Sequence, residues 1–185
     1  MAKTAVRLTE LIKTDDPIVK YEGGGVEILR TMCKPVGQVT EEHARLVARM
    51  REIMHEANGI GLAAPQIGIL QRIFVYNEGE EFHALINPII VQMRGEQVGS
   101  EGCLSLPGLY GDVLRANEVT VKGLDANGKP VRIRAQGLTA RVIQHENDHL
   151  DGILFIDRAD PDTLHYATPS SDDEDDEDDD SEQDA

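Results

Sequence analysis

A short segment near the C-terminal end of the chain reads Gln144-His145-Glu146-Asn147-Asp148-His149-Leu150. The helical spacing of apolar residues around it, and the glycine that follows it, predict a helix from about Thr139 to Gly152. Residues four apart lie on one face of a helix, so the imidazoles of His145 and His149 can reach the same ion. Glu146 then projects beside that ion, which is the arrangement of a hydrolytic metal site.

The histidines also allow a simpler interpretation. Leu138 and Val142 share the helix stripe with His145 and His149, and a single histidine in such a stripe is more often a hydrogen-bonded core residue. Two histidines with a glutamate between them would place three polar groups on a buried face, which is costly unless each finds a partner. The combination therefore favours a metal site.

A catalytic metal site with two imidazoles needs a third protein ligand. The best candidate is Cys103, which stands in Glu101-Gly102-Cys103-Leu104-Ser105. A thiolate with two imidazoles suits Zn²⁺ or Fe²⁺ and leaves a fourth position for water. The alternative is that Cys103 is a small buried hydrophobic residue. Cys33 has no motif around it and keeps that second interpretation, and two cysteines cannot form a disulfide framework.

A third cluster reads Gly59-Ile60-Gly61-Leu62-Ala63-Ala64-Pro65-Gln66. Its glycines and alanines let the backbone approach a ligand closely, and Gln66 can present an amide N–H to a developing oxyanion. A phosphate-binding loop is a poor match, because the Lys-Ser/Thr pair of such loops is missing and a helix precedes the cluster. Taken alone, the cluster is typical of a turn with a packed pair of alanines.

The remaining pattern predicts an α+β domain. Thr40 and the apolar spacing after it predict a helix over 40–58. Five segments between the two helices have strand character, namely 72–77, 82–87, 89–93, 118–122 and 131–135. A turn-forming cluster at 125–128 joins the last two as a hairpin. We expect antiparallel or mixed β-sheets packed around a central metal-binding helix, with the second helix near the N-terminal side.

Length and local composition predict the domain limits. The 185 residues fit one domain, which we expect at 17–160, after a flexible extension at 1–16. No apolar run reaches the roughly 18 residues of a membrane-spanning helix. The start lacks the features of a secretory signal, so we expect a cytoplasmic protein.

Charge is distributed unevenly along the chain. The formal net charge is −16, and eleven Asp and Glu residues without any base lie between Ser171 and Ala185. Such a run repels itself and buries nothing, so we expect a disordered acidic tail over 161–185. The charge balance also disfavours direct nucleic-acid binding, whose signature is a basic patch.

Together the three clusters resemble the peptide deformylase family. Its marker segments G-x-G-L-A-A-x-Q, E-G-C-L-S and Q-H-E-x-D-H-L all occur here in that order, at 59–66, 101–105 and 144–150. The resemblance covers about 17–158, including Pro35-Val36 and the segment 154–158. It implies a metal-dependent hydrolase that removes the formyl group from the N-terminal formyl-methionine of nascent polypeptides and releases formate.

The resemblance also implies residue roles. Glu146 would be the general acid and base, and Gln66 with the backbone N–H of Leu104 would form the oxyanion site. The ligands of one divalent metal ion would be Cys103, His145 and His149. Fe²⁺ is the usual metal of the family, with Ni²⁺, Co²⁺ or Zn²⁺ as substitutes. The pocket for the methionine side chain would include Ile60, Gly61, Leu138 and Val142.

Two features depart from the family pattern. Tyr110 stands about where many bacterial members carry an arginine that helps to hold the peptide, and acidic residues replace a basic C-terminal helix implicated in ribosome docking. The expected partners are formyl-methionyl nascent peptides, with a transient ribosome contact left open and no membrane. The acidic tail is either a solvated solubility segment or a contact for a basic partner such as a ribosomal protein.

Two other functions are compatible with H-E-x-x-H. A zinc endopeptidase would apply the same water activation to internal peptide bonds. A metal-dependent binding or regulatory module would keep the site without turnover, which the presence of Glu146 and Gln66 disfavours. Metal analysis followed by a formyl-tripeptide assay separates these functions.

Overall fold

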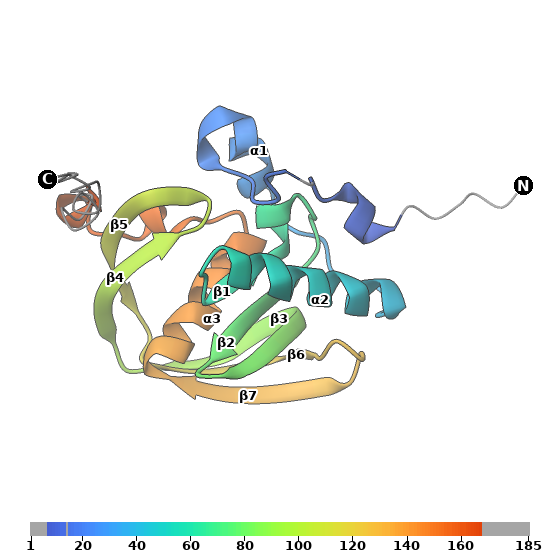
Figure 1. The fold of residues 1–185 in the computed structure, drawn as a ribbon. Helices are drawn as coiled ribbons and strands as arrows, with labels where there is room; N and C mark the ends of the chain where they lie inside the picture. Colours follow the sequence, from blue (N-terminus) through green and yellow to red (C-terminus); the bar gives the residue numbers. More distant parts are fainter. Residues whose placement is uncertain (1–6, 14, 168–185) are drawn as a thin grey trace, which may run out of the picture.

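Helix α3 (Gly137–Leu150) lies between two β-sheets in the computed structural model, which describes residues 7–13 and 15–167 (Figure 1). The larger sheet has the strand order β1-β2-β3-β6-β7, and the smaller sheet has the order β4-β5-β8. Helix α2 (Glu41–Glu56) packs on the larger sheet opposite α3. The α+β architecture with a central helix is therefore confirmed, and all pairings between the described strands are antiparallel.

The strands are β1 (Gly61–Ala63), β2 (Ile73–Glu78), β3 (Glu81–Arg94), β4 (Gln97–Cys103), β5 (Leu106–Arg115), β6 (Glu118–Leu124), β7 (Pro130–Gln136) and β8 (His165–Tyr166). Short helical turns are α1 (Val26–Leu29) and 3-10 turns at Leu8–Leu11, Ala64–Ile67, Phe155–Asp157 and Pro161–Thr163. An irregular turn at Tyr21–Gly25 contains Gly23 at φ 83° and Gly24 at φ 98°. Glycine adopts these left-handed angles without steric cost, which allows the chain to turn sharply here.

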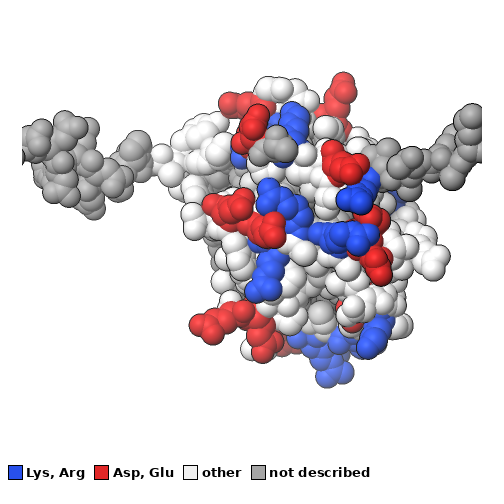
Figure 2. Space-filling model, turned by 45° about the vertical axis from the view of Figure 1, so that its right-hand side comes forward, with Lys and Arg blue, Asp and Glu red and all other residues white. Residues whose placement is uncertain are grey.

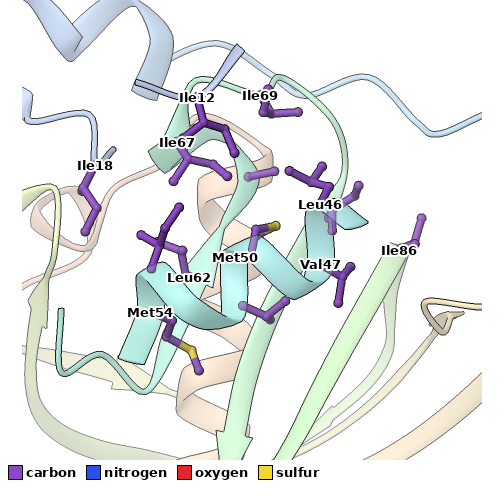
Figure 3. Close-up of a cluster of buried hydrophobic side chains, with 14 of the residues drawn as sticks. Ile12, Ile18, Leu46, Val47, Met50, Met54, Leu62, Ile67, Ile69 and Ile86 are labelled. Atoms are coloured by element: carbon purple, nitrogen blue, oxygen red, sulfur yellow. The ribbon is translucent and has the colours of Figure 1, made fainter. Parts of the chain in front are cut away.

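Helix α2 follows the limits that its sequence predicts. It begins after Thr40, whose backbone N–H donates to Nδ1 of His43 at 3.1 Å, and it ends two residues before the expected position 58. Leu46, Met50 and Met54 point from the helix into a core cluster that also contains Leu62 of β1 (Figure 3). This packing fixes the cluster at 59–66 against the sheet.

Helix α3 begins two residues earlier than expected. Strand β7 continues to Gln136, and Gly137 at φ 58° turns the chain directly into the helix. Gly152, expected to end the helix, has φ 72°, and a Cβ there would lie 2.5 Å from the carbonyl oxygen of Arg30. Ile143 and Cys33 are buried in the cluster between α3 and the larger sheet, so the interpretation of Cys33 as a core residue is confirmed.

The strand predictions are confirmed for β2, β6 and β7, including the β6–β7 hairpin. The expected strands 82–87 and 89–93 form one long strand, β3, with a register shift between Ile86 and Ile89 and Asn87 at φ 52°. Strands β4 and β5 were not expected, because the glycines at 99, 102, 108 and 111 interrupt their apolar alternation. Their conformation comes from pairing with each other, which local patterns do not reveal.

Some residues outside the expected domain of 17–160 also carry secondary structure. Residues 8–11, inside the expected extension, form a 3-10 turn next to α2, and Ile12 is buried in the α2 core. Inside the expected tail, His165 and Tyr166 pair with β5. These segments contribute apolar side chains or strand pairing that a composition argument does not weigh. Within these two expected segments, residues 1–6, 14 and 168–185 lie outside the described residues.

Candidate active site

Three metal-ligating side chains from two elements converge at the centre of the molecule. Cys103 ends β4, and His145 and His149 lie one turn apart on α3. Their ligand atoms all lie within 4.8 Å of one another, with Sγ of Cys103 3.3 Å from Nε2 of His149. Burial raises the pKa of the Cys103 thiol, but the imidazoles of His149 and His145 outweigh burial and hold this pKa well below its usual value. The thiolate is the form that binds metals.

Glu101 orients one of the two imidazoles. Its Oε2 lies 2.9 Å from Nδ1 of His145, so Nδ1 donates to this carboxylate and Nε2 is the ring nitrogen left to face a cation. A carboxylate behind a metal-ligating histidine fixes the ring and the tautomer in this way. Burial alone raises the pKa of Glu101, but hydrogen bonds from His145 and Arg115 lower it to about 2. The group is therefore a carboxylate at neutral pH.

A buried charge network surrounds Glu101. Arg115 donates from Nε and Nη2 to the two carboxylate oxygens of Glu101, each at 2.9 Å, and from Nη1 to Asp148. Arg141 adds a second cation at 2.7 Å from Glu101, and Arg158 holds Asp148 from the surface side. Sequence reasoning missed this network. Asp148 lies inside the H-E-x-x-H segment and is buried. A charged residue on the buried face of a helix needs a partner of opposite charge, and this was the signal from which the network could have been predicted.

Glu146 is buried beside Cys103, His145 and His149 and lacks a complete set of partners. Its Oε2 has no hydrogen-bond partner among the described residues, and burial raises its pKa to about 7. Gly61 makes room for it, because a Cβ on Gly61 would lie 2.3 Å from Oε1 of Glu146. An unpartnered buried carboxylate oxygen next to three convergent donors fits a site built around a cation and water.

Gln66 points its amide nitrogen into the same site. Its Oε1 accepts a hydrogen bond from the backbone N–H of Ala63 at 2.8 Å, which fixes the side-chain amide. Nε2 then lies 3.4 Å from Sγ of Cys103 and 3.3 Å from Oγ of Ser105. Gln66 is buried and lies at the wall of the cleft over the site. The structure therefore brings Gln66, predicted from a separate cluster, next to the cysteine.

Leu104 follows Cys103 directly, and its backbone carbonyl is hydrogen-bonded to a residue of the N-terminal segment. Its carbonyl oxygen accepts a hydrogen bond from Nζ of Lys20 at 3.2 Å. Backbone bonds join the same N-terminal segment to both clusters, from Val19 N–H to the Gln66 carbonyl and from Tyr21 N–H to the Ser105 carbonyl. This segment therefore fixes the positions of two parts of the site, a role that the sequence did not indicate.

A cleft of about 610 Å³ opens over the site. Its walls include the four residues expected around a methionine side chain: Ile60, Gly61, Leu138 and Val142. Val142 is buried, whereas 52 % of Ile60 and 64 % of Leu138 remain exposed and available for contact. Tyr110 also lines the cleft and stacks on His165 of β8 at a centroid distance of 6.1 Å.

The Polypeptide deformylase family model matches residues 16–164 of this chain. The chain belongs to the polypeptide deformylase family. It is 49 % identical to the peptide deformylase of Halothermothrix orenii over 144 residues, which cover 77 % of this chain and 94 % of that protein. It is 52 % identical to the peptide deformylase of Syntrophomonas wolfei over 133 residues, covering 72 % and 88 % of the two chains.

Solved deformylase structures share the fold. The crystal structure of the Thermus thermophilus peptide deformylase aligns with a TM-score of 0.74 at 45 % identity, covering 78 % of this chain and 85 % of that one. The enzyme from Synechococcus elongatus, solved in complex with actinonin, aligns with a TM-score of 0.74 at 40 % identity and covers 86 % and 88 % of the two chains. This chain therefore has the fold of solved peptide deformylases.

As a polypeptide deformylase, the chain is a metal-dependent hydrolase that removes the N-formyl group from nascent polypeptides. The expected enzyme class is thus confirmed, and the endopeptidase and turnover-deficient alternatives gain no support from these relatives. Among the described residues, no helix combines the length and the apolar character that crossing a bilayer requires.

Proposed function

We propose that Cys103, His145 and His149 hold one divalent metal ion, Fe²⁺ in the native enzyme, with Ni²⁺, Co²⁺ or Zn²⁺ able to replace it. The observation that carries this proposal is the convergence of one thiol and two imidazoles beside the unpartnered carboxylate oxygen of Glu146. One sulfur and two nitrogen donors suit these metals and leave a position free. When bound, the metal supplies Lewis acidity, which makes hydroxide available near neutral pH.

The neighbouring side chains divide the hydrolysis between them. Glu146 accepts a proton as water adds to the formyl carbon, and it returns a proton to the leaving amine as the C–N bond breaks. Formate and a free N-terminal amine are the products. Gln66 donates from Nε2 to the oxygen that gains negative charge, and the backbone N–H of Leu104 donates to the same oxygen. A base with a pKa near neutrality suits this double role.

The methionine side chain of the substrate occupies the cleft wall formed by Ile60, Gly61, Leu138 and Val142. Full burial of a methionine contributes about 1.5–3 kcal/mol of apolar binding energy. A peptide without a formyl group presents no carbonyl at the site and is not a substrate.

The catalytic unit spans about residues 17–160, and the enzyme acts in the cytoplasm, where nascent chains leave the ribosome. A transient contact with the ribosome belongs to the same proposal. The body of the chain does not carry a large basic excess, so direct nucleic-acid binding is not part of the proposal.

Metal titration tests the ligand set and the function together. Cys33 is buried with its pKa raised to about 11 by burial, whereas Cys103 is partly exposed. In metal-free folded protein, iodoacetamide should therefore modify Cys103 and spare Cys33. One equivalent of Ni²⁺ or, without air, Fe²⁺ should slow this labelling at least tenfold, as measured by peptide mass spectrometry.

In the same titration, formate release from formyl-Met-Ala-Ser should rise in parallel with protection and reach its plateau at one metal per chain, while casein stays intact. Urea-unfolded protein, in which both cysteines react, serves as the labelling control. Equal labelling of Cys103 with and without metal would remove it from the ligand set. Casein cleavage without formate release would overturn the proposed function.

Gln66→Glu tests the oxyanion donor. Glutamate keeps an oxygen that can accept from the Ala63 N–H but loses the Nε2 donor. Loss of one such donor typically lowers kcat by about 10²–10³, and we expect this drop with little change in KM and with metal content retained. Gln92→Glu, an exposed change on β3, is the matched control and should leave kcat unchanged. A kcat within threefold of the parent chain for Gln66→Glu would exclude the proposed role.

A further inference from the structure

The sheet face covered by α2 continues beyond the helix into an uncovered area on β3, β6 and β7. Directly opposed residues of an antiparallel pair lie on the same face. Ile86 opposes Leu124, and both pack in the α2 cluster. Two residues back along β6, on the same face, Lys122 opposes Arg132 of β7. Neither of these two side chains is covered, since both are exposed.

Four exposed cations share this area, and we call them the basic face: Arg94, Lys122, Arg132 and Arg134. Within 7–13 and 15–167, none of the four forms an ion pair with a carboxylate, whereas eight other arginines of these residues do. Figure 2 shows a face on which basic and acidic side chains are interleaved, as such pairing produces. The basic face therefore differs from these eight arginines, whose charges are each paired with a carboxylate.

A groove of about 430 Å³ runs along the basic face. Arg94 and Arg134 line it together with two acids, Glu78 and Glu118. Glu78 accepts a hydrogen bond from Thr139 at 3.2 Å, and Glu118 opposes Arg94 without forming an ion pair. Four cations against two carboxylates leave the area net positive.

The strand register makes this charge arrangement unfavourable for the isolated domain. Lys122 and Arg132 are directly opposed, and like charges at opposed positions destabilise an antiparallel pair. Arg134 lies on the same face one row further along β7. A bound anion would relieve this repulsion, so the basic face has the character of a site for an acidic partner.

We propose that this partner is the acidic C-terminal segment of the same chain, residues 171–185. The segment carries eleven acids and no base, nine of them consecutive at 172–180. A free polyanion would approach against a formal net charge of −16, whereas a tethered segment acts at an effective concentration on the order of millimolar. Charge complementarity and tethering therefore favour the chain's own segment over a separate ligand.

The segment is long enough for this contact. Ala167, the last described residue, donates its N–H to the carbonyl of Gly108 at 2.8 Å, so the segment departs beside β5. Fourteen residues of chain lead from Gly108 to Lys122 and span at most about 48 Å. The seventeen residues from Ala167 to Asp184 can extend over about 58 Å. Asp184 and Glu182, near the end of the segment, can therefore reach Lys122 even at this upper limit.

Nuclear magnetic resonance of the full-length, zinc-loaded chain tests the contact. The ¹⁵N-labelled protein is compared with a full-length variant in which the eleven tail acids are replaced by Asn and Gln. The screening length falls from about 30 Å at 0.01 M salt to about 3 Å at 1 M. We expect the amide signals of 118–122 and 131–136 to differ between the two chains at low salt and to coincide at high salt.

A second variant separates a direct contact from a general effect of charge. Lys122→Gln/Arg132→Gln/Arg134→Gln should abolish the tail-dependent differences, whereas the matched control Lys34→Gln/Arg51→Gln should keep them. Signals that superimpose at low salt, or differences that map elsewhere, would overturn the proposal. Differences that grow with protein concentration would assign the face to the tail of a second copy. If oligouridylate shifts the amide signals of the basic face equally in the parent chain and in the variant with the neutral tail, the face is unoccupied in both. Concentration-dependent differences and equal oligouridylate shifts would each overturn the intramolecular contact.

Discussion

Glu146→Gln is expected to lower kcat for formyl-Met-Ala-Ser by roughly 10²–10⁴, which is the usual contribution of a positioned general acid and base. Glutamine keeps the size of the side chain and fits the space beside Gly61, but it cannot accept and return the proton. Burial holds the pKa of Glu146 at about 7, where a carboxyl group can perform both steps. Formate release under saturating substrate measures the effect.

Metal content must be measured on the same samples, because Glu146 lies between two proposed ligands in sequence. The matched control is Glu41→Gln, an exposed glutamate in the first turn of α2, which should leave kcat and metal content unchanged. Undiminished turnover by metal-loaded Glu146→Gln would remove Glu146 from the reaction. A drop that parallels metal loss would instead indicate a structural role.

Arg115→Met is expected to lower the free energy of unfolding by about 3–5 kcal/mol, the usual cost of removing one partner from a buried ion pair. Both carboxylates that Arg115 contacts, Glu101 and Asp148, would stay buried without this cation. Metal affinity should fall about 10–100-fold as well, because Glu101 would hold His145 less firmly. Urea unfolding and competition with a chelating dye measure the two effects.

Arg158→Met is the matched control for this change. Arg158 contacts the same Asp148, but 43 % of its side chain is exposed, so solvent screens the pair and we expect a loss of at most about 1 kcal/mol. Arg115→Lys keeps the charge without the two parallel hydrogen bonds and should fall between the two. A loss below 1 kcal/mol for Arg115→Met would show that Glu101 and Asp148 find other partners.

Local patterns predicted the elements that carry the chemistry. The spacing of His145 and His149, the cap at Thr40 and the hairpin turn at 125–128 depend on neighbours within a few residues, and each formed as expected. The family resemblance then linked three separate segments. The structure brings Cys103 and Gln66 from two of these segments to the imidazoles of the third.

Long-range pairing produced the features that were not predicted. Strands β4 and β5 contain four glycines, and Glu101 reaches His145 only because β4 packs against α3. Arg115 and Arg141, which contact Glu101, lie 14 and 40 residues from it along the chain. No local motif links residues at such separations. Nothing in the residues around 20 indicated that Lys20 would hold the carbonyl of Leu104.

The sequence by itself determined the two long helices, the hairpin, the candidate ligands and the family, because these depend on residue type and short spacing. Only the tertiary structure decided which side chains orient the ligands, how far β8 extends the smaller sheet and which cations remain unpaired on the larger one. These properties arise when segments far apart in the chain are brought within hydrogen-bond distance. A buried charge is stable only when a partner of opposite charge or a hydrogen bond is present. A segment of low strand propensity forms a strand only when it pairs with a neighbouring strand.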